Sequence, residues 1–196
     1  MKKWIVILLC FLLFPMTALA HPGGLDAAQG HRDPGDLSGL GSYHYHCEGR
    51  EAHLHIWSLC PFSEAYVEYK QAKDAILSLL AQEEWTEAQE DELRVLLSHM
   101  LLPFGITKEQ MENENVRFMA TAEENVHVRK KPSAKGTSAA CANAEGTPVL
   151  ATDAALDGWY PVQYWHQGAV LQGYVRADEL AEISLKEYAA LLCDLL

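Results

Sequence analysis

The chain has 196 residues, of which 27 are acidic and 15 are basic, so its formal net charge is −12 at neutral pH. An excess of negative charge repels the phosphate backbone, which argues against nucleic acid as a partner. A chain of this length is expected to form one or two small domains, each with a modest apolar core.

Residues 1–20 have the pattern of a secretory signal peptide. Two lysines precede an apolar run from Trp4 to Phe14, and small residues follow at Ala18 and Ala20. The run is about half of the roughly 20 residues needed to cross a bilayer, so we expect cleavage rather than a retained membrane span. The sequence therefore predicts a secreted or envelope-associated protein.

Four cysteines follow the predicted signal, at Cys47, Cys60, Cys141 and Cys193. Outside the cytosol an even number of cysteines is typical of disulfides. Four cysteines allow three connectivities, and we favour Cys47 with Cys60 and Cys141 with Cys193.

The predicted first domain, residues 21–61, is rich in Gly, His and Asp and has neither helical nor strand periodicity. Such a segment cannot bury an apolar core. It must be disordered or be held by something other than hydrophobic burial.

Four histidines lie close together in the stretch YHYHCEGREAHLH, residues 43–55, as two His-x-His pairs. Residues two apart share one face of a strand, so each pair presents both rings to one side. If the residues between the pairs form a hairpin turn, His46 lies opposite His53 and His44 opposite His55. Cross-strand Cβ atoms are then about 5 Å apart, which lets the four rings share one cation.

Further donors lie upstream of this stretch, and bound metal would supply the folding free energy that the segment otherwise lacks. Zinc is the leading ion because it suits imidazole-rich sites, with copper or nickel next. Cys47 and Cys60 are alternative ligands to a disulfide. The predicted metal ligands are His21, Asp26, His31, His44, His46, His53 and His55.

The motifs HPGGLD, SGLGSYHYHC, AHLH and CP occur in this order within residues 21–61. They resemble the YHYH-domain family of small exported bacterial proteins. Gln29 stands where the family pattern leads us to expect glycine. The resemblance implies an exported protein and names no reaction.

Residues 62–114 predict a helical hairpin. Apolar residues recur at helical spacing in EAYVEYKQAKDAILSLL behind Ser63, a suitable N-cap. The stretch TEAQEDELRVLLSHMLL repeats the spacing after a capping box of Thr86 and Gln89. A shorter helix is expected from Thr107. We assign no catalytic role to the acidic first turn of the second helix, Glu87, Glu90, Asp91 and Glu92.

Residues 115–183 predict a small all-β domain, because short β-rich runs alternate with turn residues, as in a barrel or sandwich. Residues 184–196 open with a capping box of Ser184 and Glu187 and predict a helix that packs on this domain. The motifs NVHVRKKPS, GTPV, GWYPV and GYV resemble bacterial SH3-like domains of exported proteins, although His127 and an Ala-rich loop around Cys141 depart from the pattern.

The SH3-like resemblance implies attachment to cell-wall peptidoglycan or to a protein partner. Tyr160 and Trp165 are the predicted surface contacts for that attachment. The predicted fold class is thus α+β and multidomain: a His-rich metal-stabilised module, a helical hairpin, an SH3-like barrel and a terminal helix. The first function hypothesis is a non-catalytic, envelope-associated protein that binds zinc.

The alternative is a zinc-dependent hydrolase that acts on cell-wall peptide. The ligand types of lysostaphin-like metallopeptidases are matched by a set of one residue from each of three pairs: His21 or His31, Asp26 or Asp33, and His53 or His55. Three protein ligands with an open position permit hydrolysis. The short first domain lacks a formed cleft and an evident general base, so we predict no catalytic residues. A metal-stabilised interaction module without a metal-handling role is a third hypothesis.

Overall fold

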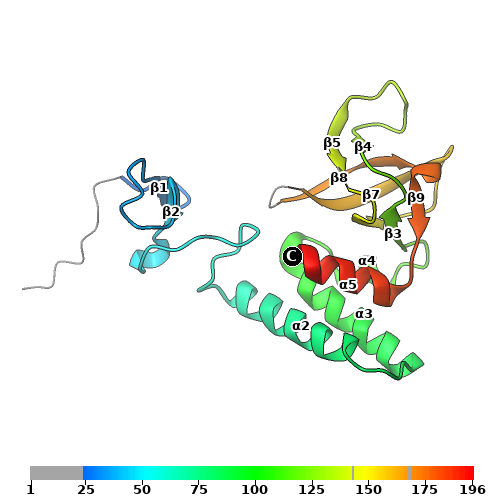
Figure 1. Ribbon diagram of the computed structural model, residues 1–196, viewed down its shortest axis with the longest axis horizontal. Coiled ribbons are helices and arrows are strands. Elements are labelled where there is room, and N and C mark those ends of the chain that lie inside the picture. Colours follow the sequence, from blue (N-terminus) through cyan, green and yellow to red (C-terminus); the bar gives the residue numbers. More distant parts are fainter. Residues whose placement is uncertain (1–23, 143, 167–168) are drawn as a thin grey trace, which may run out of the picture. The chain divides into compact units, whose positions relative to one another are not determined.

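The structure is a computed structural model that describes residues 24–142, 144–166 and 169–196. The chain divides into two compact units, the first ending at Leu54 and the second running from His55 to Leu196 (Figure 1). The predicted signal peptide and His21 lie outside the described residues. Of the helices that the structure describes, none is long and apolar enough to cross a membrane.

The N-terminal unit is built on two short antiparallel strands. β1 (Gly30–Arg32) pairs with β2 (Tyr43–Tyr45), and the 3-10 turn η1 (Cys47–Gly49) follows. Gln29 has a φ of 62°, the left-handed region that glycine adopts without strain. The buried side chains of residues 24–54 are all polar: His31, Asp33, His44 and His53.

The predicted helices of the second unit are confirmed. Each begins directly after its predicted cap, whose side-chain oxygen accepts a hydrogen bond from the backbone N–H three residues later. Those after Thr86 and Thr107 have complete capping boxes. The helices are α2 (Glu64–Leu80), α3 (Glu87–Leu101), α4 (Lys108–Glu112) and α5 (Leu185–Leu195).

The rest of the second unit is a seven-stranded antiparallel sheet in the order β5-β4-β8-β7-β6-β3-β9. Its strands are β3 (Arg117–Thr121), β4 (Val126–Arg129), β5 (Ser138–Ala142), β6 (Pro148–Ala151), β7 (Trp159–His166), β8 (Ala169–Arg176) and β9 (Leu180–Glu182). The helices and this sheet belong to one α+β unit, His55–Leu196. The predicted fold class, with a helical hairpin and an SH3-like domain as separate parts, is therefore wrong.

The physical reason is that the sheet buries apolar side chains on both faces. Adjacent strand residues point to opposite faces, and Leu150 packs with the helices while Val149 joins a second core among the strands. Helix α5 packs against α2, α3 and β3. The helices therefore share an apolar core with one face of the sheet, and the two do not form separate domains.

Trp165 shows the consequence of this shared core. It is 3% exposed and lies in the core that faces the helices, so its predicted role as a surface contact is wrong. Tyr160 is half-buried against the second core, and its predicted role in attachment stays a prediction.

Strand β5 lies in the Ala-rich segment where the sequence predicts a loop. Its residues pair with β4 in register, including Cys141 opposite His127. Cys193 instead lies on α5 in the helical core, where burial raises the pKa of its thiol to about 11. No disulfide joins any two of the described cysteines, so the predicted pairing of Cys141 with Cys193 is not formed.

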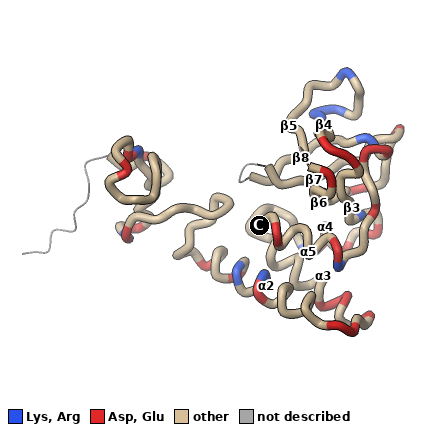
Figure 2. The backbone as a smooth tube through the Cα atoms, in the orientation of Figure 1, with Lys and Arg blue, Asp and Glu red and all other residues tan. Residues whose placement is uncertain are grey.

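Acidic residues gather where α2 passes into α3 (Figure 2). The acidic side chains of the first turn of α3 are all exposed. A negative charge at this end of a helix is favourable because of the helix dipole. The acidic turn is thus explained by solvation and helix stability.

Candidate metal centres

Two groups of side chains in the described residues bring possible metal ligands together. We call them the three-histidine group and the cysteine-histidine group. Within each group the ligand atoms lie within 4.8 Å of one another. The three-histidine group consists of His31, His44 and His46, and the cysteine-histidine group consists of Cys47, His53, His55 and Cys60.

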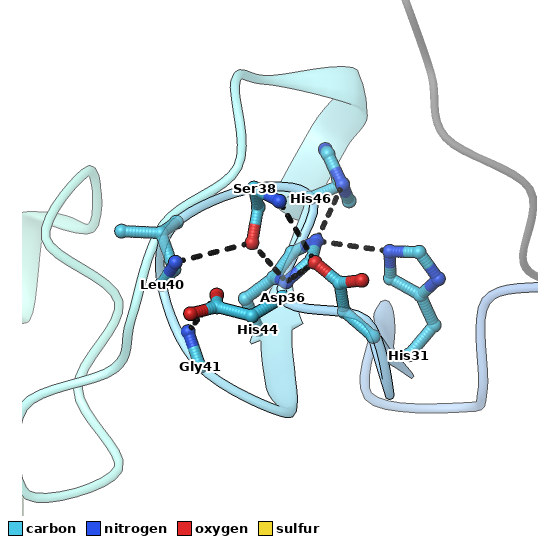
Figure 3. Close-up of polar contacts among 8 residues, drawn as sticks. His31, Asp36, Ser38, Leu40, Gly41, His44 and His46 are labelled. Atoms are coloured by element: carbon cyan, nitrogen blue, oxygen red, sulfur yellow. Dashed lines mark hydrogen bonds and ion pairs between the residues drawn. The ribbon is translucent and has the colours of Figure 1, made fainter.

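The β1–β2 ladder assembles the three-histidine group. His31 is the cross-strand partner of His44, and His46 follows two residues later on the same side of the chain. The Nε2 atom of His44 lies 2.9 Å from that of His31 and 3.2 Å from that of His46 (Figure 3). Three ring nitrogens therefore point toward a common centre.

Hydrogen bonds at the other ring nitrogens orient two of these histidines. The Nδ1 atom of His46 lies 3.1 Å from the carbonyl oxygen of Arg50, which can only accept, so Nδ1 carries the proton. The Nδ1 atom of His44 lies 3.1 Å from the hydroxyl of Ser38 and 3.9 Å from the carboxylate of Asp33 (Figure 3 shows the Ser38 contact). The bond to Arg50 leaves the Nε2 lone pair of His46 for a metal, and the Ser38 hydroxyl can pair with His44 in either tautomer.

The interior of the three-histidine group favours a cation. His44 is fully buried, and its Nε2 atom faces two other imidazole nitrogens at hydrogen-bond distance. When each of the three rings carries its proton on Nδ1, the Nε2 lone pairs face one another and repel. A shared cation replaces this repulsion with attraction to all three nitrogens at once.

Two tight turns assemble the cysteine-histidine group within the continuous segment 47–60. Ile56 and Leu59 pair through both backbone hydrogen bonds, 3.0 and 2.9 Å long, around Trp57 and Ser58. Both turn residues have positive φ, 52° and 65°, as in a type I′ hairpin turn. The residues next to this pair are His55 and Cys60, so the turn places them side by side.

The other half of the group comes from β2 and the turn η1. Tyr45 and His53 form an antiparallel bridge, which returns the chain beside Cys47. The Nδ1 atom of His53 lies 2.8 Å from the carbonyl oxygen of Glu51 and therefore carries the proton, which leaves Nε2 for a metal. The group thus combines two thiols and two imidazoles, a ligand set typical of structural zinc.

The four imidazoles of residues 43–55 do not converge on one centre as predicted. His53 lies opposite Tyr45, whereas the prediction placed it opposite His46. Because side chains alternate along a strand, this shift by one residue turns His53 to the side of Tyr45 and away from His44 and His46. The same histidines therefore divide between two groups.

Asp26 belongs to neither group. Its carboxylate accepts hydrogen bonds from the hydroxyl of Tyr43 and from the backbone N–H groups of Ala28 and Gly30. The bond from Tyr43 lowers the pKa of Asp26, and the carboxylate in turn raises the pKa of Tyr43 to about 12. Asp26 therefore shapes the turn before β1. His21, the remaining predicted ligand, lies outside the described residues.

Cys47 and Cys60 are grouped with His53 and His55, and no disulfide joins them. The structure thus favours the alternative in which both cysteines are ligands. Sequence reasoning named Asp33 as an upstream oxygen donor, but it missed Ser38 and the position of both residues beside His44. Only a correct β1–β2 register, with His31 opposite His44, would have pointed to them.

Comparison of this chain with models of known protein families, with curated proteins and with solved structures finds no match. The support for metal binding therefore comes from the two donor groups themselves.

Proposed function

We propose that this protein binds transition-metal ions, with zinc preferred, and that the ions hold its N-terminal region in its fold. The observation that carries the proposal is the cysteine-histidine group, whose four ligand atoms all lie within 4.8 Å of one another. Ligands of a tetrahedral zinc ion are about 3.3 to 3.8 Å apart, given zinc–sulfur and zinc–nitrogen distances of about 2.3 and 2.1 Å. Only a small contraction around the ion is needed.

The composition of the N-terminal interior supports the same proposal. Residues 24–54 bury histidine and aspartate side chains and no apolar side chain. Burying polar side chains does not offset the conformational entropy lost on folding. Metal coordination provides of the order of 10 kcal/mol in small zinc domains, which is enough to order such a unit.

We further propose that the protein is exported and acts at the cell envelope, bound to cell-wall peptidoglycan or to an envelope protein through its second unit. The signal-like pattern of residues 1–20 supports export. N-terminal sequencing of the secreted chain tests the cleavage, with His21 expected as the first residue. Co-sedimentation of the full mature chain with purified cell walls tests the attachment.

Metal analysis of the purified mature chain tests the central proposal. We expect zinc to co-purify, and we expect His53→Ala and Cys60→Ser each to lose one equivalent. The matched controls are His127→Ala and Cys141→Ser on β4 and β5, which lie outside both groups. Controls that lose metal as the site variants do, or a mature chain that takes up no ion at any loading, would refute the proposal.

Metal-dependent hydrolysis of wall peptide is a second candidate function. The three-histidine group favours it, because three imidazoles with an open position resemble the ligand set of catalytic zinc. The predicted combination of an aspartate with His53 or His55 is not among the donor groups of the described residues. Release of peptide from cell walls that is lost in His46→Ala and kept in His127→Ala would support a hydrolase.

A further inference from the structure

We propose that the second unit binds a sugar unit of an acidic glycan in a polar hollow on its sheet. This inference rests on the proposed attachment at the cell envelope for the source of its ligand, and it adds the chemical class of that ligand. It does not depend on either metal group, because every residue that lines the hollow belongs to the second unit.

Polar side chains line most of this hollow, which has a volume of about 330 Å³. That volume lies within the range of sites that take a small molecule. Gln163 on β7 and Gln172 on β8 are cross-strand partners, so their side chains share one face of the sheet. The polar side chains that line the hollow are Gln110, Lys130, Thr152, Gln163, Gln172 and Tyr174.

Gln163 is the residue that points to a ligand. Its side chain is 5% exposed, and its Oε1 atom has no hydrogen-bond partner among the described residues. A buried amide oxygen without a donor costs free energy, so such atoms are rare in folded proteins. A ligand in the hollow that donates a hydroxyl group to this amide removes that cost.

The groups that meet in the hollow favour a sugar over a peptide. A sugar hydroxyl both donates and accepts, as does the amide of a glutamine, and glutamines from α4, β7 and β8 line the hollow. Pro161 and Tyr174, which are cross-strand partners, add apolar surface against which the C–H groups of a sugar ring can pack. Peptides are typically held at a strand edge with pockets for their side chains, whereas this lining is a polar face of a sheet.

Lys130 adds a positive charge at the hollow and begins a basic loop. The exposed Lys130, Lys131 and Lys135 lie between β4 and β5, where Figure 2 shows basic residues in the loop. No acidic residue occurs in the sequence between Glu124 and Glu145, although the whole chain has a net charge of −12. An ammonium group binds a carboxylate or a phosphate as a point charge, so the preferred sugar carries one of these anionic groups.

The strand pairing holds Lys130 at the hollow. A Cβ atom at Gly173 would lie 2.8 Å from the carbonyl oxygen of Arg129. The absence of a side chain at Gly173 therefore lets β4 pass close to β8, where Arg129 pairs with Tyr174. Lys130 follows directly, and its backbone N–H donates to the carbonyl oxygen of Thr137 across the loop. The position of the cation is thus set by the backbone.

Titration of the full mature chain, followed by NMR, tests the proposal with two pairs of sugars and one peptide. N-acetylmuramic acid and N-acetylglucosamine differ by a lactyl carboxylate, glucose 1-phosphate and glucose differ by a phosphate, and the peptide is trialanine. We expect the acidic sugar of one pair to bind about tenfold more tightly than its neutral counterpart, and the pair that responds separates a carboxylate from a phosphate. Trialanine that binds as tightly as the sugars, or two pairs without a preference for the acidic member, would overturn the inference.

Two variants assign the binding to the hollow. Lys130→Ala is expected to remove the preference for the acidic sugar. Gln163→Met keeps the length of the side chain and removes the amide, so we expect sugar binding to weaken about tenfold or more. The melting temperature should be unchanged or higher, because the amide oxygen has no protein partner to lose among the described residues. The matched controls are Lys70→Ala and Gln71→Met on α2, which do not line the hollow.

A second glutamine variant keeps the test decisive if Gln163→Met is less stable than the unaltered chain. Gln172→Ala changes an exposed side chain opposite Gln163 and is expected to weaken sugar binding without loss of stability. Unchanged sugar binding in both glutamine variants would overturn the inference, and if the chain still sediments with cell walls, the proposed attachment remains. A chain that binds the acidic sugar through Gln163 but does not sediment with cell walls would refute the attachment and support the sugar site.

Discussion

The two units of this protein have opposite interiors. The N-terminal unit buries His31, Asp33, His44 and His53, whereas the second unit buries apolar side chains from its helices and strands. The second unit therefore has the ordinary source of folding free energy, the removal of apolar surface from water. The first unit needs a different source, which the proposed metal binding would supply.

This difference explains why the two units carry different tasks. A hydrophobic core is non-directional and tolerates many sequences of similar volume. A metal centre requires particular atoms at particular distances, so its residues are both the structure and the chemistry of the unit. The proposed function therefore lies where the apolar core is missing.

The largest expected difference between the two units is in their response to the removal of metal. We expect a strong chelator to unfold residues 24–60 and to leave the helices and sheet of the second unit folded, because these have their own core. Hydrogen exchange followed residue by residue measures this difference, and added zinc should restore protection. Equal loss of protection in α3 and in β2 would show that the two interiors are not independent.

A core substitution should have the reverse effect. Leu97 on α3 is fully buried, whereas Leu102 is 52% exposed. We expect Leu97→Ala to lower the free energy of unfolding of the second unit by about 2 to 5 kcal/mol, because it leaves a cavity. The zinc content should not change.

The matched control for this substitution is Leu102→Ala, for which we expect a change of about 0.5 kcal/mol or less. Thermal unfolding of both variants, with metal analysis, makes the comparison. If Leu97→Ala lost zinc at a temperature where the second unit is still folded, the apolar core and the metal groups would not be independent of each other.

A smaller change should act on one metal group alone. Ser38→Ala removes the hydroxyl that lies 3.1 Å from Nδ1 of His44. Loss of such a supporting contact typically costs about 10- to 100-fold in metal affinity. We expect this loss at the three-histidine group, measured by competition with a chromophoric chelator, and no change at the cysteine-histidine group. The exposed Ser42 supplies the control Ser42→Ala, and an equal effect there would argue against a role for the Ser38 hydroxyl.

The helices could be predicted well because their signals are local. Ser63, Thr86, Thr107 and Ser184 each cap the helix that follows, and a cap acts within a single turn of the chain. Strand β5 was missed because its small residues carry little β-propensity of their own, and its pairing with β4 comes from elsewhere in the chain. Trp165 was misplaced for a related reason, since the helices that cover it lie far away in the sequence.

The sequence by itself determined which atoms are available to a metal: a cluster of histidines and two cysteines in a segment whose apolar residues have neither helical nor strand periodicity. The tertiary structure decided which of these atoms lie close enough together to share an ion. That decision depends on strand register, because His31 lies opposite His44 and His53 lies opposite Tyr45. A shift of one residue turns a side chain to the other face of a strand, and local sequence does not determine that shift.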